Sequence, residues 1–171
     1  MSRYVALLRG VSPMNANMAQ LKACFETMGF ANVKTLLSSG NVAFDAGRQA
    51  ESGLATTIAA GMQKNLPRSF PVIVRSTAHL RALIETDPYA AFEIPANAKR
   101  VVTFLDGAVA EVPALPLESD GARILALRGS EVFTAYVPHQ RGPVFMTLIE
   151  KTFGKNLTTR TWDTVKKCAN A

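Results

Sequence analysis

The polar residues best suited to binding a negatively charged ligand are an arginine at the end of an apolar segment and a serine-rich turn. The candidate residues in these two segments are Arg9, Ser12, Ser39, Gly40 and Asn41. A guanidinium group, hydroxyl groups and turn amides are donors that can hold a phosphate or a carboxylate. The alternative is structural: Arg9 pairs with a neighbouring carboxylate or caps carbonyl groups, and the SSGN sequence is favourable turn chemistry.

A second group of candidates lies in LTTRTWDTVKK, at residues 157–167, which holds the single tryptophan of the chain. Arg160 and Trp162 could stack a guanidinium and an indole on a nucleobase, an interaction worth roughly 1–3 kcal/mol per base. In the alternative interpretation Trp162 covers the core where a helix leaves the sheet, and Arg160 lies on the exposed side of an edge strand.

Residue patterns typical of catalysis are weak or absent in the sequence. His79 falls in the first turn of a predicted helix, and His139 falls in a loop near Arg141. His139 could serve as a general base, but no carboxylate or nucleophile is linked to it by spacing. The sequence has no GxSxG, P-loop, GxGxxG or HExxH motif. We therefore leave enzymatic activity open and predict no cofactor and no metal site.

Composition limits the possible partners and the cellular location. Of the 171 residues 48% are hydrophobic and 19% are charged, which is typical of a globular chain. The net charge of +6 favours an anionic small molecule or nucleic acid as a partner, although the basic residues are scattered. No apolar segment approaches the roughly 20 residues that span a bilayer. Cys24 and Cys168 lack metal-ligand spacing and are predicted to be reduced core residues. We expect a cytoplasmic protein without a membrane partner.

Hydrophobic periodicity predicts a βαββαβ order in the first half of the chain, which is the order of the ferredoxin-like unit. Gly40 and Asn41 fit a hairpin turn because both tolerate a positive φ. The predicted elements are a strand at 3–10, a helix at 18–30, two strands within 33–46, a helix at 51–66, a strand at 69–76 and a helix at 77–87.

The pattern repeats after a proline-containing linker at 88–98. The predicted elements there are a strand at 99–107, a hairpin at 123–137, a helix at 143–154, and a strand at 157–162 that runs into a final helix. Aligning the halves places Gly107 on Gly10, Gly129 on Gly40, Phe133 on Phe44, Arg160 on Arg75 and Thr161 on Ser76. The first connection of the second half is shorter and interrupted by prolines. We predict an α+β fold of two ferredoxin-like βαββαβ halves, residues 1–87 and 99–171, with mainly antiparallel sheets and helices on one face.

This topology predicts which candidates lie close together. The first two strands of such a unit run in the same direction, so the loop after Arg9 should adjoin the Ser39-Gly40-Asn41 turn. Arg160 and Trp162 should lie at the opposite end of their own half. An RNA-recognition module is disfavoured because its aromatic K/R-G-F/Y-G/A-F-V-x-F/Y run is missing, and Phe44, Phe133 and Tyr136 are predicted to be packing residues.

Three segments also carry a family resemblance. YVALLRGV at 4–11, TLLSSGNVAF at 35–44 and TTRTWDTVKK at 158–167 resemble the bacterial domain-of-unknown-function family 1697. The resemblance implies an α+β protein of about this size built from ferredoxin-like units, and it brings no established activity or catalytic residue. The chain departs from the commoner family pattern at Ser12 and at Thr161, each of which replaces an asparagine.

The resulting functional hypothesis is a non-catalytic module that binds an anionic ligand, either nucleotide-like or nucleic acid. One alternative is a small hydrolase or transferase with a site between the two halves. Another is a protein-interaction module that pairs through a sheet edge.

Overall fold

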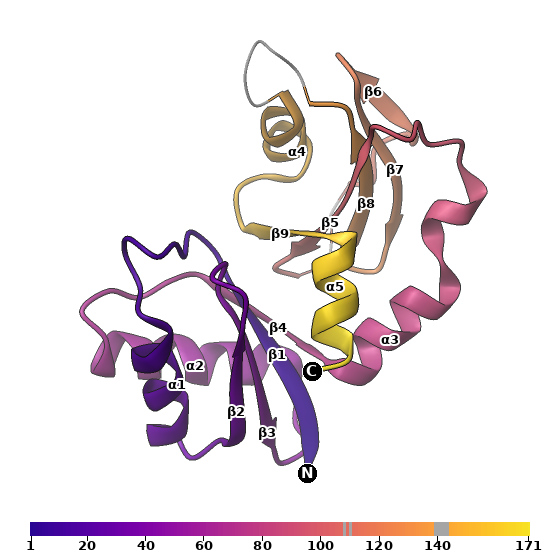
Figure 1. Ribbon diagram of the computed structural model, residues 1–171. Coiled ribbons are helices and arrows are strands. Elements are labelled where there is room, and N and C mark those ends of the chain that lie inside the picture. The colour runs from indigo at the N-terminus through magenta and orange to yellow at the C-terminus, as the bar shows by residue number, and fades with distance from the viewer. Residues whose placement is uncertain (108, 110, 139–143) are drawn as a thin grey trace. The chain divides into compact units, whose positions relative to one another are not determined.

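The computed structural model describes residues 1–107, 109, 111–138 and 144–171 (Figure 1). His139 and Arg141 lie outside the described residues. The chain divides into two compact units, of which the first comprises Met1–Ala82 together with Lys166–Ala171 and the second comprises Leu83–Val165. Within the described residues, no helix has the length and apolar character needed to cross a bilayer.

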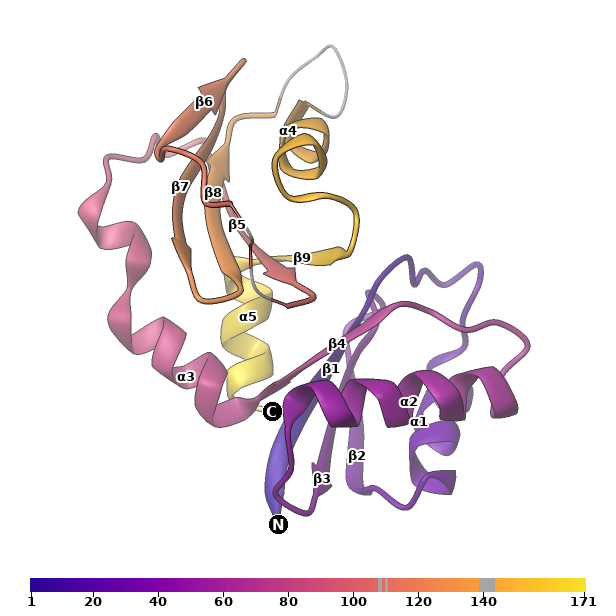
Figure 2. The same ribbon diagram turned by 180° about the vertical axis from the view of Figure 1, so that it is seen from behind.

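The first unit has one four-stranded antiparallel sheet with the strand order β2-β3-β1-β4. Its elements are β1 (Ser2–Leu8), α1 (Met18–Thr27), β2 (Ala31–Leu36), β3 (Asn41–Ala46), α2 (Glu51–Asn65) and β4 (Val72–Ser76). Both helices α1 and α2 cover the same face of this sheet (Figure 2). The complete predicted βαββαβ order and the two-strand hairpin are therefore present in the first unit.

The core of the first unit forms because alternate strand residues point toward the two helices. Phe44 of β3 is fully buried there, with ring centroids 5.6 Å from Phe25 and 4.5 Å from Phe30. Leu21 and Cys24 lie on the apolar face of α1, as the helical periodicity predicted. The Cys24 thiol is buried, and this burial raises its pKa.

The second unit is built on a five-stranded antiparallel sheet with the order β6-β7-β8-β5-β9. The remaining elements are α3 (Thr77–Thr86), the 3-10 helix η1 (Pro88–Ala91), β5 (Lys99–Leu105), β6 (Leu117–Ser119), β7 (Ala122–Arg128), β8 (Glu131–Tyr136), α4 (Val144–Phe153), β9 (Leu157–Thr161) and α5 (Trp162–Ala169). The short strand β6 stands where the βαββαβ order predicts a helix, because the connection is too short and proline-rich for one.

The sheet of the second unit packs side chains on both of its faces. Val132 of β8 belongs to the cluster that includes Phe145 and Ile149 of α4. The next residue, Phe133, points to the opposite face and contacts Tyr89 of η1 and Trp162 of α5. Helices α1 and α2 lie on one face of the first sheet, as expected, but Val5, Leu7 and Ala43 on its other face are buried as well. The second sheet also covers its other face, with aromatic residues.

Strand pairing reveals the same pattern in both units. Val5 of β1 pairs with Ala43 and Arg75, and Val102 of β5 pairs with Phe133 and Arg160. Strands β1, β3 and β4 of the first unit therefore correspond to β5, β8 and β9 of the second unit, residue pair by residue pair. This register confirms the alignment of Arg160 on Arg75.

Main-chain hydrogen bonds outside the ladders repeat as well. The Leu8 amide donates to the Gly40 carbonyl at 2.9 Å, and the Leu105 amide donates to the Ser130 carbonyl at 2.8 Å. Gly40 thus corresponds to Ser130, so the alignment of Gly129 on Gly40 is wrong by one residue. The alignment of Phe133 on Phe44 is wrong for the same reason: Phe133 corresponds to Ala43, and a one-residue shift reverses the face of a strand.

The helix caps after the two edge strands are equivalent too. The Ser76 hydroxyl accepts a hydrogen bond from the His79 amide at 3.1 Å, and the Thr161 hydroxyl accepts one from the Thr164 amide at 3.3 Å. These side chains satisfy amide groups that have no partner inside a helix. Ser76 is therefore the N-cap of α3, and Thr161 is the N-cap of α5.

Candidate functional site

The end of the first sheet brings together Arg9 and the β2–β3 turn. Arg9 directly follows β1, and its amide donates to the Pro71 carbonyl at 2.9 Å. The preceding residue, Leu8, is bonded to Gly40, so the turn adjoins the end of β1 as the topology predicted. Arg9 is half-buried, whereas Ser39 is exposed.

Gly40 is required where the loop after β1 packs on the turn. Its φ is +83°, and an added Cβ would lie 2.8 Å from the Val11 Cβ and 3.1 Å from the Leu8 Cβ. A side chain at this position would therefore collide with both neighbours and strain the backbone. The close approach fixes the loop after β1 against the turn.

Asn41 has a structural role in the turn. It is fully buried, and its side-chain amide donates to the Leu36 carbonyl and to the Ser39 hydroxyl, both at 3.0 Å. These bonds close the four-residue loop 37–40, in which Leu37 is 48% exposed at a φ of +58°. Asn41 thereby positions the Ser39 hydroxyl.

The loop that contains Ser12 is also ordered by its own side chains. Asn15 accepts a hydrogen bond from the Ser12 amide at 2.9 Å and donates one to the Gly10 carbonyl at 2.8 Å. Asn17 caps helix α1 by accepting from the amides of Ala19 and Gln20. The half-buried Ser12 therefore sits in a defined turn between β1 and the start of α1.

Arg160 and Trp162 belong to the second unit, whereas the other five candidates belong to the first. Arg160 is 8% exposed, and its Nη1 atom donates to the Thr158 hydroxyl and to the Thr159 carbonyl, both at 2.7 Å. Its strand β9 is an edge strand, as predicted, but the side chain is buried rather than exposed.

Trp162 packs into an aromatic cluster with Tyr89 and Phe133. Its ring centroid lies 5.2 Å from that of Tyr89 and 6.3 Å from that of Phe133, both edge to face. Only 8% of the residue is exposed. The Tyr89 hydroxyl lies 2.9 Å from the Val101 carbonyl and 3.0 Å from the Thr134 carbonyl, and burial raises the pKa of this phenol. This packing agrees with the structural interpretation of Trp162.

His79 lies beside a carboxylate that the sequence did not link to it. Its Nδ1 atom is 3.5 Å from Oε2 of Glu51, and the same carboxylate accepts the Ser76 amide at 2.6 Å. Burial raises the pKa of Glu51, but the hydrogen bonds from His79 and Ser76 outweigh it and hold this pKa below its usual value. The contact connects the start of α2 to the junction of β4 and α3.

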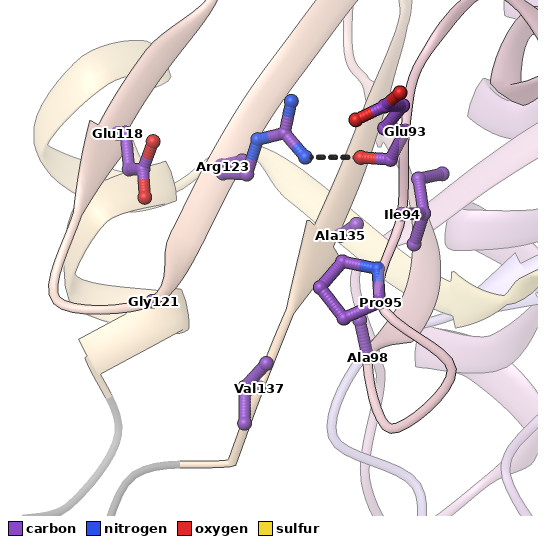
Figure 3. A pocket seen from close by; sticks show the side chains of 9 residues that line it. All are labelled: Glu93, Ile94, Pro95, Ala98, Glu118, Gly121, Arg123, Ala135 and Val137. Carbon is purple, nitrogen blue, oxygen red and sulfur yellow. Dashed lines mark hydrogen bonds between the residues drawn. The ribbon is translucent and has the colours of Figure 1, made fainter.

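One pocket of about 490 Å³ lies within the second unit (Figure 3). Residues 93–98, the β6–β7 turn and the end of β8 form its walls. Arg123 lines it and donates to the Glu93 carbonyl at 2.7 Å, and Glu118 lines it from β6. No sequence pattern indicates this pocket, because its residues come from three separate segments without a shared motif. The described residues contain no group of three or more His, Cys, Asp or Glu side chains that could hold a metal ion.

Comparison with known proteins places this fold in a family. The conserved bacterial protein SP0830 from Streptococcus pneumoniae has a solved structure that covers 99% of this chain and 97% of its own, with a TM-score of 0.74 and 17% identity. No curated protein matches the sequence. The model of the family described as "Protein of unknown function (DUF1697)" matches residues 1–133, in agreement with the resemblance of the three segments. Because this match spans most of the sequence, the chain belongs to the DUF1697 family.

Proposed function

We propose that the protein is a non-catalytic module that binds a small anionic ligand, such as a nucleotide phosphate, at the end of the first sheet. The proposed strand-end site consists of Arg9, Ser12 and Ser39. The observation that carries the proposal is the bond between Leu8 and Gly40, which holds the serine turn against the residue next to Arg9. A guanidinium and two hydroxyl groups on adjoining loops are suitable donors for phosphate oxygens.

The charge of the segments that form this site supports an anion. Arg9 is the only charged residue within 8–17 and 35–42. At the equivalent end of the second unit, Asp106 takes the place of Arg9, because its amide donates to the Asn156 carbonyl as the Arg9 amide donates to Pro71. The first end therefore offers a cation where the second offers a carboxylate.

The proposed site does not use Arg160 or Trp162, because both pack within the second unit. Binding should accordingly depend on the phosphate and little on the identity of a base. A protein that neutralises few phosphates should also lose affinity only modestly with added salt. Inorganic phosphate, nucleoside monophosphates and short oligonucleotides distinguish a small-ligand site from a nucleic-acid surface.

Calorimetric titration at low salt tests the proposal with matched variants. Arg9→Ala should weaken phosphate or nucleotide binding roughly tenfold to a hundredfold, as expected for a lost charged hydrogen bond. Arg48→Ala is the control, because Arg48 is an exposed arginine that follows β3 and lies beyond the opposite end of the same sheet. No binding by the wild type, or an equal loss in both variants, would remove the proposal.

An activity panel on the same proteins separates this function from the enzymatic alternative. Turnover in the wild type that disappears in Arg9→Ala, with the fold retained by circular dichroism, would favour a hydrolase or transferase. Capture of a protein partner through the exposed edge of β2 would favour the interaction module instead.

We also infer that one folding unit is used twice, with residues 1–87 and 99–171 as halves and 88–98 as the linker. The repeated strand register and the repeated main-chain bonds support this division. A cytoplasmic location is part of the same proposal and is supported by two buried cysteines that form no disulfide, Cys24 and Cys168.

A further inference from the structure

The pocket of the second unit lies beside Ala135, a position at which the first unit has an aspartate. Asp45 pairs with Arg3 across β1 and β3, and Ala135 pairs with Arg100 across β5 and β8. In the first unit the Asp45 carboxylate accepts hydrogen bonds from Asn32 at 2.7 Å and from Arg3 at 2.9 Å. Ala135 lines the pocket and brings no carboxylate to this place.

Arg123 lies on the other side of Ala135, on β7, and faces the same pocket. In the part of the chain that the structure describes, its hydrogen-bond partner is the main-chain carbonyl of Glu93, at 2.7 Å. A guanidinium has five N–H donors, so most of its donors remain for a ligand. The half-buried side chain also keeps contact with solvent through the open side of the pocket.

The charges around Arg123 determine the kind of ligand that would fit. Glu118 lies directly across from Arg123 in the β6–β7 pair, and Glu93 lines the opposite wall, so Arg123 stands between two carboxylates (Figure 3). One guanidinium and two carboxylates would repel a phosphate dianion. A ligand that carries a carboxylate and an ammonium group would match both signs of charge.

The rest of the lining is apolar. Ile94, Ala98 and Val137 form this part of the pocket, and its volume of about 490 Å³ is within the range of small-molecule sites. An apolar side chain of moderate size could contact these residues while the charged groups of the ligand face Arg123 and Glu118.

We propose that this pocket binds an α-amino acid with an apolar side chain. Arg123 holds the ligand carboxylate at the place that Asp45 occupies in the first unit, and Glu118 holds the ammonium group. The proposal is independent of the strand-end site, because the two sites share no residue.

Calorimetry of the whole protein with L-leucine, L-leucinamide and N-acetyl-L-leucine tests each contact separately. Arg123→Gln should weaken leucine binding roughly tenfold or more and affect leucinamide, which lacks the carboxylate, much less. Glu118→Gln should weaken leucine and leucinamide but not N-acetyl-leucine, which lacks the ammonium group. Arg128→Gln is the control, because Arg128 is exposed on the same strand and does not line the pocket.

Ala135→Asp provides a second test by supplying the carboxylate from the chain itself. It should pair with Arg123 and abolish leucine binding while circular dichroism shows a retained fold. Should this buried substitution unfold the protein, Arg123→Gln alone decides the question. The proposal is overturned if the wild type does not bind leucine, if it binds inorganic phosphate better at this pocket, or if leucine binding is unchanged in Arg123→Gln.

Discussion

Arg9 follows β1 in the first unit, and Asp106 follows the equivalent strand β5 in the second unit. The amide of each residue donates to the carbonyl of the residue just before the edge strand β4 or β9, which is Pro71 in the first unit and Asn156 in the second. The neighbouring hairpin positions are Asn41 and Glu131, which pair with Leu7 and Phe104 respectively.

The main chain of the two units is therefore alike at positions where the side chains differ in charge and size. Backbone hydrogen bonds depend little on the side chain, so a register can persist while the chemistry of its ends changes. Function then has to be argued from the side chains of each unit separately, and the fold supplies only the frame.

The largest expected effect concerns two buried phenylalanines, Phe133 in the sheet of the second unit and Phe44 in the sheet of the first unit. Phe133→Ala should lower the free energy of unfolding by about 3–5 kcal/mol, since it removes a fully buried ring. It should also shift the native fluorescence of Trp162, the single tryptophan, whose ring contacts Phe133. Phe44→Ala should cost a similar amount without changing this native emission. Equal emission changes in both variants would contradict the finding that Phe133, and not Phe44, packs against Trp162.

The next effect compares the two hairpin glycines. Gly40→Ala should destabilise the protein by about 2–4 kcal/mol, because the backbone strain at positive φ adds to collisions with Val11 and Leu8. Gly129→Ala should show only the backbone strain of about 1–2 kcal/mol, since its nearest atom lies 3.7 Å away. Urea denaturation measures both, and a larger loss at Gly129 would refute the packing argument.

The two helix caps should respond alike. Ser76→Ala and Thr161→Ala should each cost about 1 kcal/mol, because each removes the acceptor for an amide in the first turn of a helix. The control is Ser76→Thr, which keeps the hydroxyl and should be nearly neutral. A cap substitution without effect in one unit would break the equivalence of these junctions.

The smallest effect concerns the aspartate that the second unit lacks. Hydrogen bonds from Asn32 and Arg3 hold the pKa of Asp45 below its usual value. The ionised Asp45 carboxylate therefore stabilises the folded protein fully above about pH 3.9, the pKa of an unfolded aspartate. This stabilisation is lost as the pH falls through the lower pKa that Asp45 has in the folded protein. Asp45→Asn should cost less than about 1 kcal/mol at neutral pH, since the pair lies near the surface.

Denaturation at two pH values checks this sign. The difference between Asp45→Asn and the wild type should shrink in strongly acidic solution, where the wild-type carboxyl group is protonated. A difference that grows toward acid would contradict the lowered pKa.

The sequence was sufficient for the family, the α+β class, the antiparallel sheets and most elements, because periodicity and turn residues are local signals. It also placed Arg9 next to the β2–β3 turn, since this neighbourhood follows from strand directions alone. The predicted division of the chain and the ligand-binding residues remain predictions.

The one-residue error in aligning the hairpins has a specific cause. Leu36 pairs with Asn41, so the first hairpin has a four-residue loop, whereas Arg128 pairs with Glu131 and leaves a loop of two residues. Gly40 ends the longer loop and Gly129 begins the shorter one. Matching glycine to glycine therefore shifted the alignment of the following strands.

The burial of Arg160 and the pocket beside Ala135 could not be predicted from linear patterns. An arginine on an edge strand is normally solvated, and only the tertiary structure shows that this one is buried and bonded to Thr158 and Thr159. The pocket depends on a small residue opposite two arginines on neighbouring strands, a relation that exists only after the strands pair.

The most direct test of the central claim is an amide chemical-shift titration of the whole protein with inorganic phosphate at low salt. We predict saturable shifts at residues 9–12 and 38–40 and none at 106–107 and 128–130, with the first set abolished in Arg9→Asp, which copies the second unit. Equal shifts at both ends, or shifts that persist in Arg9→Asp, would contradict an anion site created by Arg9.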